Sequence, residues 1–418
     1  MADPSEDPTA GLRAYLDASP SPWHAVESSV AALDTAGFIA LDERAAWTDV
    51  PAAGYVSRGG ALIAWRRPTT PRSARIVGAH TDSPGLRLKP GGGTSRAGWR
   101  QLGVEVYGGV LLNSWLDRDL GLAGRLLLAD GSSVLLRIDE PVARVPQLAI
   151  HLDRDVNERG LVLDRQLHLA PVWATDPALD LSEWLEEAAG AEAPMAWWEL
   201  CLFDVQPAAV LGADRSLLAS GRLDNLVSCW AATTALVGAE STEHVAMIAL
   251  FDHEEVGSAS TTGASGPFLS TVLERVSAAG GAGRDEFHRL LAASSCVSAD
   301  NAHAVHPNYA ERHDPEHAPM VNAGPAIKLN ANQRYATSAD TAREFELAAA
   351  RAGCPVQRFV SRNSVPCGST IGPLTATRLG IATVDVGVPQ LSMHSARELC
   401  GVLDPGWLAA ALTEYLAG

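Results

Sequence analysis

The stretch VAMIALFDHEEVGS, residues 245–258, carries seven apolar residues in a row and then four polar ones. An apolar run of this length, stopped by polar residues, is typical of a strand that is buried on both faces of a sheet. In open α/β sheets, functional side chains gather at the carboxyl ends of the strands. The stretch therefore predicts an α/β fold with a polar site directly after this strand.

Much of the rest of the chain alternates between strand-like and helix-like segments. Helical apolar spacing is found at 12–36, with a break at 19–22, and at 223–237, 268–277, 339–352 and 404–416. Short apolar runs predict strands at 55–56, 62–65, 75–78, 294–297 and 381–386. This alternation favours a mostly parallel sheet that is flanked by helices on both faces.

The pattern changes between residues 90 and 210. Residues 90–101, PGGGTSRAGWRQ, are rich in glycine and predict a boundary loop. From 102 to about 210 the runs are short and β-rich, and only residues 180–190 are helical in pattern. The simplest architecture is one α/β domain interrupted by a β-rich insertion, with two or three sequential domains as the alternative.

Composition narrows the class of protein and its compartment. The 418 residues carry a formal net charge of -17, which argues against nucleic acid or an anionic membrane as partner. The six cysteines form no CxxC pair, and scattered thiols suit the reducing cytoplasm. The polar N-terminal stretch does not resemble a signal peptide, and no apolar run reaches the length of a membrane span. We therefore expect a cytoplasmic protein.

Metal-ligand residue types recur after the predicted strands. His80 and Asp82 follow the strand at 75–78, and Glu254 and Glu255 follow the strand at 245–251. Asp300 follows the strand at 294–297, His394 follows the strand at 381–386, and Asp224 opens the helix at 223. Taken singly, each residue has another explanation. Asp224 could be an acidic residue in the first turn of a helix, and Glu254 and Glu255 could lie in a solvated turn. Together, carboxylates crowded beside buried strands would repel one another, and two divalent cations would relieve this.

Hydrolysis with two metals needs different roles from these residues. Asp224 has the short carboxylate that suits a bridge between two ions. Glu254 is placed to take a proton from water and to hand it to the leaving amine. Asp82 is placed to accept the second ring N–H of His80, which would fix the tautomer of that ligand.

Other hydrolytic chemistries are less well supported. The chain has no G-x-S-x-G elbow, and HEEVG at 253–257 lacks the second histidine of H-E-x-x-H. Cys367 in PCGST has no dedicated His/Asp partner, and this segment predicts a tight turn instead.

Six stretches, in order along nearly the whole chain, resemble the aspartyl aminopeptidase family of dinuclear zinc metallopeptidases. They are GAHTDSPGLRLKP (78–90), SGRLDNL (220–226), FDHEEVGS (251–258), SADNAHAVHPNY (298–309), GPAIKLN (324–330) and PQLSMHSARE (389–398). The resemblance implies that one metal is held by His80, Asp224 and Asp300. It implies that the other is held by Asp224, Glu255 and His394.

The resemblance also implies a division of the chain and an assembly. Residues 1–90 and 218–418 would form a discontinuous catalytic metallopeptidase domain, and 91–217 an inserted β-rich dimerisation domain. Members of the family form tetrahedral dodecamers built from dimers. In the insertion, AIHLDRDVNE (149–158) is similar to the family segment that places a histidine, here His151, in a neighbouring subunit's site.

The chain holds only two lysines, Lys89 and Lys328. The resemblance implies that Lys328 is a pocket cation for the side-chain carboxylate of the substrate, with help from His303. A dense group of histidines at 303, 306, 313 and 317 predicts either a further metal or substrate site or a loop with ordinary hydrogen bonds. We favour ordinary hydrogen bonds for His313 and His317.

The sequence thus predicts a metal-dependent aminopeptidase that removes N-terminal Asp and Glu from peptides. Its cofactors would be two divalent ions per subunit, zinc by default, with manganese or cobalt as alternatives. A related dinuclear hydrolase with neutral aminopeptidase or N-acyl amino-acid amidohydrolase specificity is one alternative. An inactive oligomeric peptide-binding scaffold is another.

Overall fold

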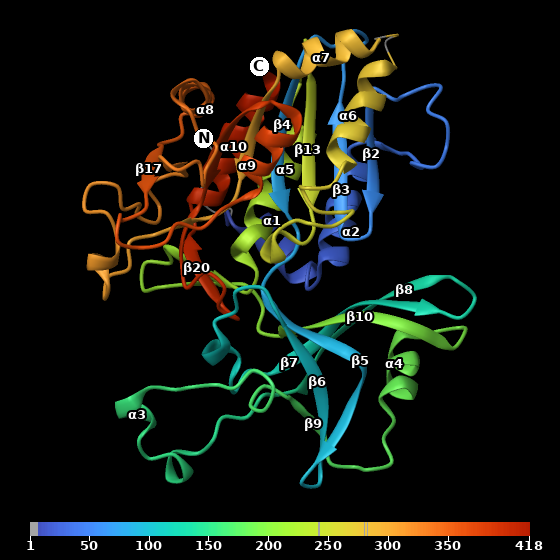
Figure 1. Cartoon of the computed structure of the whole chain (residues 1–418), viewed down its shortest axis with the longest axis vertical. Coiled ribbons are helices and arrows are strands. Elements are labelled where there is room, and N and C mark those ends of the chain that lie inside the picture. The colour runs from blue at the N-terminus through green and yellow to red at the C-terminus, as the bar shows by residue number, and fades with distance from the viewer. Residues whose placement is uncertain (1–6, 241–242, 280, 282) are drawn as a thin grey trace.

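The structure is a computed structural model that describes residues 7–240, 243–279, 281 and 283–418. Figure 1 shows two parts, one above the other: a sheet sandwiched between helices, and a smaller β-rich part formed by the middle of the chain. No helix in the described ranges is long and apolar enough to cross a membrane.

The larger part is built on a nine-stranded sheet. Five of its neighbouring strand pairs are parallel and three are antiparallel, so the sheet is mostly parallel, as predicted. In spatial order its strands are β1 (Ile39–Ala40), β2 (Ala53–Arg58), β3 (Ala61–Arg66), β13 (Val245–Phe251), β4 (Ala74–His80), β14 (Ser295–Ala299), β18 (Ala382–Gly387), β16 (Ala326–Leu329) and β17 (Gln357–Val360).

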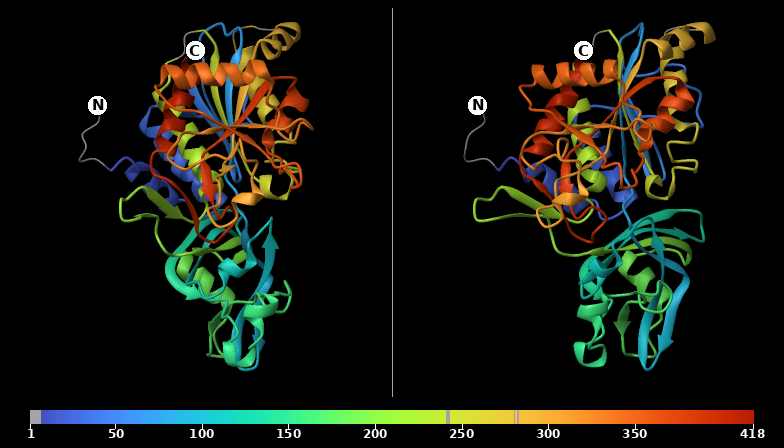
Figure 2. Two further views of the ribbon diagram at one scale, coloured as in Figure 1. Left: turned by 90° about the vertical axis from the view of Figure 1, so that its left-hand side faces the viewer. Right: turned by 60° about the vertical axis from the view of Figure 1, so that its left-hand side comes forward.

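Helices cover both faces of this sheet, as Figure 2 shows. One face carries α1 (Ala10–Ala18), α2 (Pro22–Thr35), α5 (Leu223–Gly238), α8 (Ala339–Arg351) and α10 (Asp404–Ala417). The other carries α6 (Phe268–Ala278), α7 (Arg284–Ala292) and α9 (Ile371–Leu379), of which α7 and α9 were not predicted.

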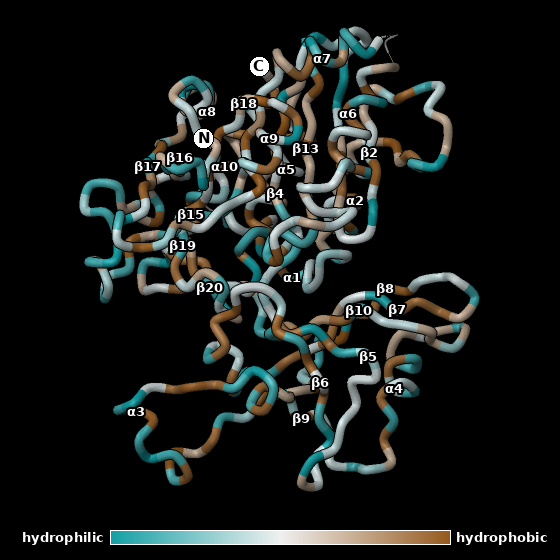
Figure 3. The backbone as a smooth tube through the Cα atoms, viewed as in Figure 1, coloured by the Kyte–Doolittle hydropathy of each residue, from teal (hydrophilic) through white to brown (hydrophobic). Residues whose placement is uncertain are grey.

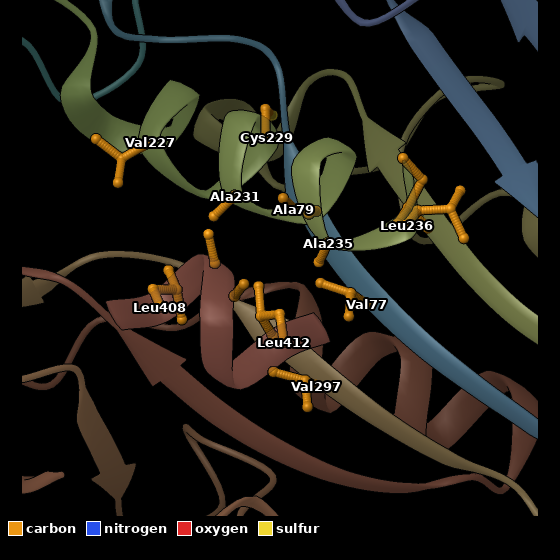
Figure 4. Packing of buried hydrophobic residues seen from close by; sticks show 14 of the residues in the cluster. Val77, Ala79, Val227, Cys229, Ala231, Ala235, Leu236, Val297, Leu408 and Leu412 are labelled. Carbon is orange, nitrogen blue, oxygen red and sulfur yellow. The ribbon is translucent and has the colours of Figure 1, made fainter. Parts of the chain in front are cut away.

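Strand β13 explains why the sheet forms at this place in the chain. All seven of its residues are buried, and they alternate between the two apolar clusters. Ile248 and Leu250 pack into the α5 and α10 side, and Met247 and Phe251 into the α6 side. Figure 4 shows alanines of α5 facing leucines of α10, where the small side chains let the two helices approach closely.

The smaller part is a six-stranded sheet formed by residues between 85 and 204. Its strands in spatial order are β8 (Ser133–Ala143), β7 (Leu120–Leu128), β10 (Met195–Asp204), β5 (Gly85–Arg96), β6 (Trp99–Tyr107) and β9 (Val172–Ala174). Beside them lie α3 (Val156–Arg159) and α4 (Leu181–Ala189), and α4 matches the helix predicted at 180–190. Strand β5 crosses residue 91, and the boundaries 91–217 of an insertion domain stay a prediction.

The boundary loop predicted at 90–101 is wrong. These residues form the turn of the β5–β6 hairpin and the strand ends beside it. The glycines that suggested a loop serve the hairpin instead: the strand register shifts between Leu88 and Gly93, and Gly98 with a φ of 85° lies in the turn. Glycine marks an irregular strand as well as a loop, so composition alone did not separate the two.

A third sheet of five strands joins the two parts near the site described next. Its order is β11 (Ala209–Leu211), β12 (Leu217–Ser220), β20 (Glu398–Gly401), β19 (Pro389–Leu391) and β15 (Ala302–His303). The turn between β19 and β20 carries His394.

Candidate metal centre

The polar residues predicted from the sequence meet at one edge of the nine-stranded sheet. Strands β4, β13 and β14 are parallel neighbours, so their carboxyl ends lie side by side. His80 is the last residue of β4, Asp300 follows β14, and Glu254 and Glu255 lie in a 3-10 turn (Glu254–Val256) after β13. Asp224 lies in the irregular first turn of α5, before the regular helix begins.

Two groups of side chains share Asp224. In one, the Nε2 atom of His80 lies 3.5 Å from Asp224 Oδ1 and 3.8 Å from Asp300 Oδ1. In the other, the Nε2 atom of His394 lies 3.3 Å from Asp224 Oδ2 and 3.4 Å from Glu255 Oε1. In each group the possible ligand atoms lie within 4.8 Å of one another. The two oxygens of Asp224 therefore face two different histidines.

The tautomers of both histidines follow from their second ring nitrogens. His80 Nδ1 lies 2.9 Å from the backbone carbonyl of Asp82, and His394 Nδ1 lies 3.0 Å from that of Gly109. A carbonyl oxygen only accepts hydrogen bonds, so each Nδ1 carries the proton. Each Nε2 thus points at carboxylates, and it is the nitrogen whose lone pair a cation could take in place of a proton.

The charge in this centre is strongly unbalanced towards the negative. Burial raises the pKa of Glu254 to about 7 and holds that of Glu255 well above its usual range. Burial alone would lower the pKa of His394, but its hydrogen bond with Asp224 and the charge of Glu255 raise it to about 10. Such shifts mean that the site favours positive charge, which bound cations supply.

Donor chemistry fits divalent metal ions. Imidazole nitrogen and carboxylate oxygen are the ligands that zinc takes in hydrolases. Asp224 Oδ1 and Glu255 Oε1 are buried and accept no hydrogen bond from the described residues. Buried carboxylate oxygens left without a donor are costly, and coordination to a cation would satisfy them.

Asp82 is fully buried beneath His80 and receives three hydrogen bonds. Its carboxylate accepts from the Tyr107 hydroxyl at 2.7 Å and from the backbone N–H groups of Glu254 and Glu255 at 3.0 and 3.1 Å. Its Oδ1 atom lies 3.5 Å from His80 Nδ1, although the shorter contact of that nitrogen is with the Asp82 carbonyl. Burial would raise the pKa of Asp82, but the pairing with His80 lowers it.

Glu398 was not predicted, and it links two of the candidate ligands. It is buried, and its carboxylate accepts from the backbone N–H of His394 at 2.6 Å and from that of Asp224 at 2.9 Å. Burial raises its pKa to about 8. Its position four residues after His394, in a motif already singled out, was the available signal.

The residues proposed to bind substrate lie in three different places. Lys328, 2% exposed, has its Nζ atom 3.6 Å from Asp300 Oδ2 and donates to the Asn301 carbonyl at 3.2 Å. His303 is exposed and packs edge-on against Phe359. His151 is exposed in the six-stranded part and belongs to none of the candidate ligand groups.

The remaining candidates have ordinary partners. His313 accepts from the backbone N–H of His306, and His317 pairs with Asp314 at 2.8 Å. No ligand group found among the described residues includes these histidines. His253, next to the two glutamates, turns to hydroxyl groups of Ser260 and Thr262.

Several known proteins are similar to this chain over nearly its whole length. A family model described as aminopeptidase I zinc metalloprotease (M18) matches residues 15–415. A protein of Streptomyces coelicolor, called a probable M18 family aminopeptidase 2, is 52% identical over 419 residues, which are 98% of this chain and 97% of that one. The crystal structure of prApe1 is similar with a TM-score of 0.93 and 30% identity, covering 98% of this chain and 94% of that one. The structure of the S. cerevisiae mApe1 dodecamer is similar with a TM-score of 0.85 and 29% identity, covering 97% of this chain and 95% of that one.

Proposed function

This chain belongs to the M18 family of zinc metalloprotease aminopeptidases, and from that premise we propose that it removes N-terminal aspartate and glutamate from peptides. The family makes it a metal-dependent aminopeptidase.

Two divalent ions, zinc with manganese or cobalt as alternatives, would occupy the two groups of side chains. His80, Asp224 and Asp300 would hold one ion, and Asp224, Glu255 and His394 the other. The single observation that carries this proposal is the placement of Asp224 between two histidines, at 3.5 and 3.3 Å. Each oxygen of this one carboxylate lies beside a different histidine Nε2, so Asp224 could serve both ions.

Each remaining group has a defined task. When bound, such ions polarise the peptide carbonyl and make water a stronger nucleophile. Glu254 accepts the proton of the attacking water and delivers it to the leaving amine, because its Oε2 atom lies 4.0 Å from His80 Nε2, at the mouth of the site. Asp82 keeps the strand end that carries His80 aligned with the turn that carries Glu254.

Lys328 supports the preference for acidic substrates. Its ammonium group is buried beside Asp300 and lies 5.0 Å from the centre of the Tyr335 ring. A substrate carboxylate would give this cation a second negative partner beside Asp300. A leucine side chain would leave it with Asp300 alone. His303, at the exposed margin, would add a hydrogen bond to the same carboxylate.

The six-stranded part supports a homo-oligomeric assembly, which we propose to be a dodecamer built from dimers. Its segment 146–168 exposes several large apolar side chains, with Leu152 at 74% and Val162 at 83%. Figure 3 shows hydrophobic stretches of the backbone around α3, on the margin of the molecule. Apolar side chains gathered at one margin are typical of a surface that a partner covers. By resemblance, His151 would reach a neighbouring subunit's site.

The test of the specificity is a panel of aspartyl, glutamyl and leucyl chromogenic amides with the wild type, Lys328→Met and Lys89→Met. Lys89 is the matched control, because it is the only other lysine in the sequence and its ammonium group donates to Gln166 rather than to a candidate metal ligand. We expect the wild type and Lys89→Met to prefer the acidic amides. We expect Lys328→Met to lose about 10- to 100-fold in the aspartyl-to-leucyl ratio of kcat/KM.

Two outcomes would overturn the proposal. A wild type that prefers the leucyl amide would remove the acidic specificity and leave metal-dependent peptidase activity in place. An unchanged ratio in Lys328→Met would remove the role of Lys328. The ratio is the right measure, because the contact of Lys328 with Asp300 means that absolute rates also report on the metal centre.

A further inference from the structure

We propose, given the proposed ligand roles of Glu255 and His394, that residues 107–111 are a positioning segment that aligns the metal centre from the six-stranded sheet. The segment leaves the end of β6 and passes directly over the candidate ligands. Successive residues in it contact Asp82, Glu255 and His394. It belongs to the β-rich part of the chain, for which the family resemblance implies a role in dimerisation.

Tyr107 holds the buried carboxylate under His80. Its hydroxyl donates to Asp82 Oδ2 at 2.7 Å, beside the N–H of Glu255 that donates to the same oxygen. The guanidinium of Arg87 lies 3.5 Å from the centre of the Tyr107 ring. A ring packed in this way has little freedom, so its hydroxyl fixes the orientation of the Asp82 carboxylate.

Gly109 and Leu111 hold His394 from both its side chain and its backbone. The Gly109 carbonyl accepts from His394 Nδ1 at 3.0 Å, and the backbone N–H of Leu111 donates to the His394 carbonyl at 3.1 Å. The first bond sets the tautomer that turns Nε2 towards Asp224. The second holds the turn that carries the histidine.

The two glycines allow this close approach. A Cβ atom on Gly109 would lie 3.2 Å from His394 Nδ1, and one on Gly108 would lie 3.1 Å from the Cβ atom of Glu255. Both distances are tighter than ordinary contacts, so an added Cβ atom would require the neighbouring candidate ligand to shift by a few tenths of an ångström. The segment therefore needs small residues where it passes the site, and a hydroxyl where it reaches Asp82.

This arrangement makes the six-stranded sheet part of the catalytic machinery. A shift of that sheet relative to the nine-stranded one would move the partners of Asp82 and His394 together. Partners of metal ligands typically change metal affinity or activity about 10- to 100-fold when they are removed. We expect the same range here.

The experiment compares zinc affinity, by chelator competition, in the wild type, Tyr107→Phe and Gly109→Ala. Two controls are matched to them. Tyr55→Phe also removes a single hydrogen bond from a tyrosine to an aspartate, at 2.8 Å to Asp34, far from the site. Gly103→Ala lies in the same strand β6, where an added Cβ meets Gly92 at an ordinary 3.5 Å.

We expect about 10- to 100-fold weaker zinc binding in Tyr107→Phe and Gly109→Ala, with a lower kcat and a KM near that of the wild type. Both controls should bind zinc like the wild type. Wild-type zinc affinity in Tyr107→Phe, even with a lower Tm of the metal-free protein, would overturn the positioning role. If Gly109→Ala fails to fold, Tyr107→Phe decides alone, since it removes one oxygen atom. A wild type that binds no zinc would instead overturn the proposed ligand set.

Discussion

Glu254 and Glu255 are adjacent in the chain but face different partners. Glu254 Oε2 lies 4.0 Å from His80 Nε2, whereas Glu255 Oε1 lies 3.4 Å from His394 Nε2. The short turn after β13 separates them, because successive side chains in a 3-10 turn point in different directions. Two identical side chains can therefore have separate roles, one as base and one as ligand.

We expect Glu254→Gln to lower kcat by about 10²- to 10⁴-fold, since an amide cannot take a proton from water. Its metal content should stay that of the wild type. Glu255→Gln is the matched comparison, and we expect it to lose metal as well as activity. Steady-state kinetics with metal analysis of both variants would check this. Rates like those of the wild type in Glu254→Gln would refute its role as base.

The first turn of α2 carries a buried histidine between the two parts of the molecule. His24 Nδ1 lies 2.7 Å from the hydroxyl of Ser21. Burial, together with the nearby charges of Arg137 on β8 and of Arg222, lowers the pKa of His24 from 6.5 to about 4. The folded protein thus binds this proton less tightly than the unfolded chain does. Stability that is present above pH 6.5 is lost as the pH falls towards 4.

We expect His24→Gln to reduce the loss of stability between pH 7 and pH 4.5. The group can contribute at most about 3 kcal/mol to that loss, from its pKa shift. Thermal unfolding of the metal-free protein at several pH values would measure it. His288→Gln, at an exposed position on α7, is the control and should keep the wild-type pH dependence. An identical pH profile for wild type and His24→Gln would contradict the expectation.

The middle section of the chain has two functional regions, one at the metal centre and one at the margin of the molecule. Residues 107–111 contact the centre of their own subunit, while His151 and the apolar side chains of segment 146–168 are exposed and belong to none of the candidate ligand groups among the described residues. Figure 1 shows α3 at the far margin of the lower part. The role proposed for His151 is therefore one in a neighbouring subunit's site.

Mixed assemblies test this directly. Glu254→Gln removes the base of its own site, and we expect His151→Ala to lower the activity of a neighbouring site. In a mixed dimer, the His151→Ala subunit keeps its own Glu254 and receives His151 from its partner. We expect co-expressed or remixed variants to recover activity well above the average of the two separate variants. Activity equal to that average would contradict a role for His151 between subunits.

Much of the fold was predictable from local patterns. The apolar run 245–251 became the buried central strand, and helices expected at 223–237, 268–277, 339–352 and 404–416 lie within a few residues of α5, α6, α8 and α10. The failure at 90–101 has a physical cause, because glycines that shift a strand register look like loop glycines in a sequence. Helix α9 begins at the Thr370 cap, which the sequence analysis did not recognise.

The sequence by itself determined which residue types stand after which strands, and parallel strands share one edge, so His80, Glu254, Glu255 and Asp300 had to meet there. Only the tertiary structure decided what holds them. The carbonyl of Gly109 accepts from His394, 285 residues further along the chain. Every residue has a backbone carbonyl, so no sequence pattern marks the one that orients a ligand. The packing of the six-stranded sheet against the nine-stranded one determines which carbonyl lies beside His394.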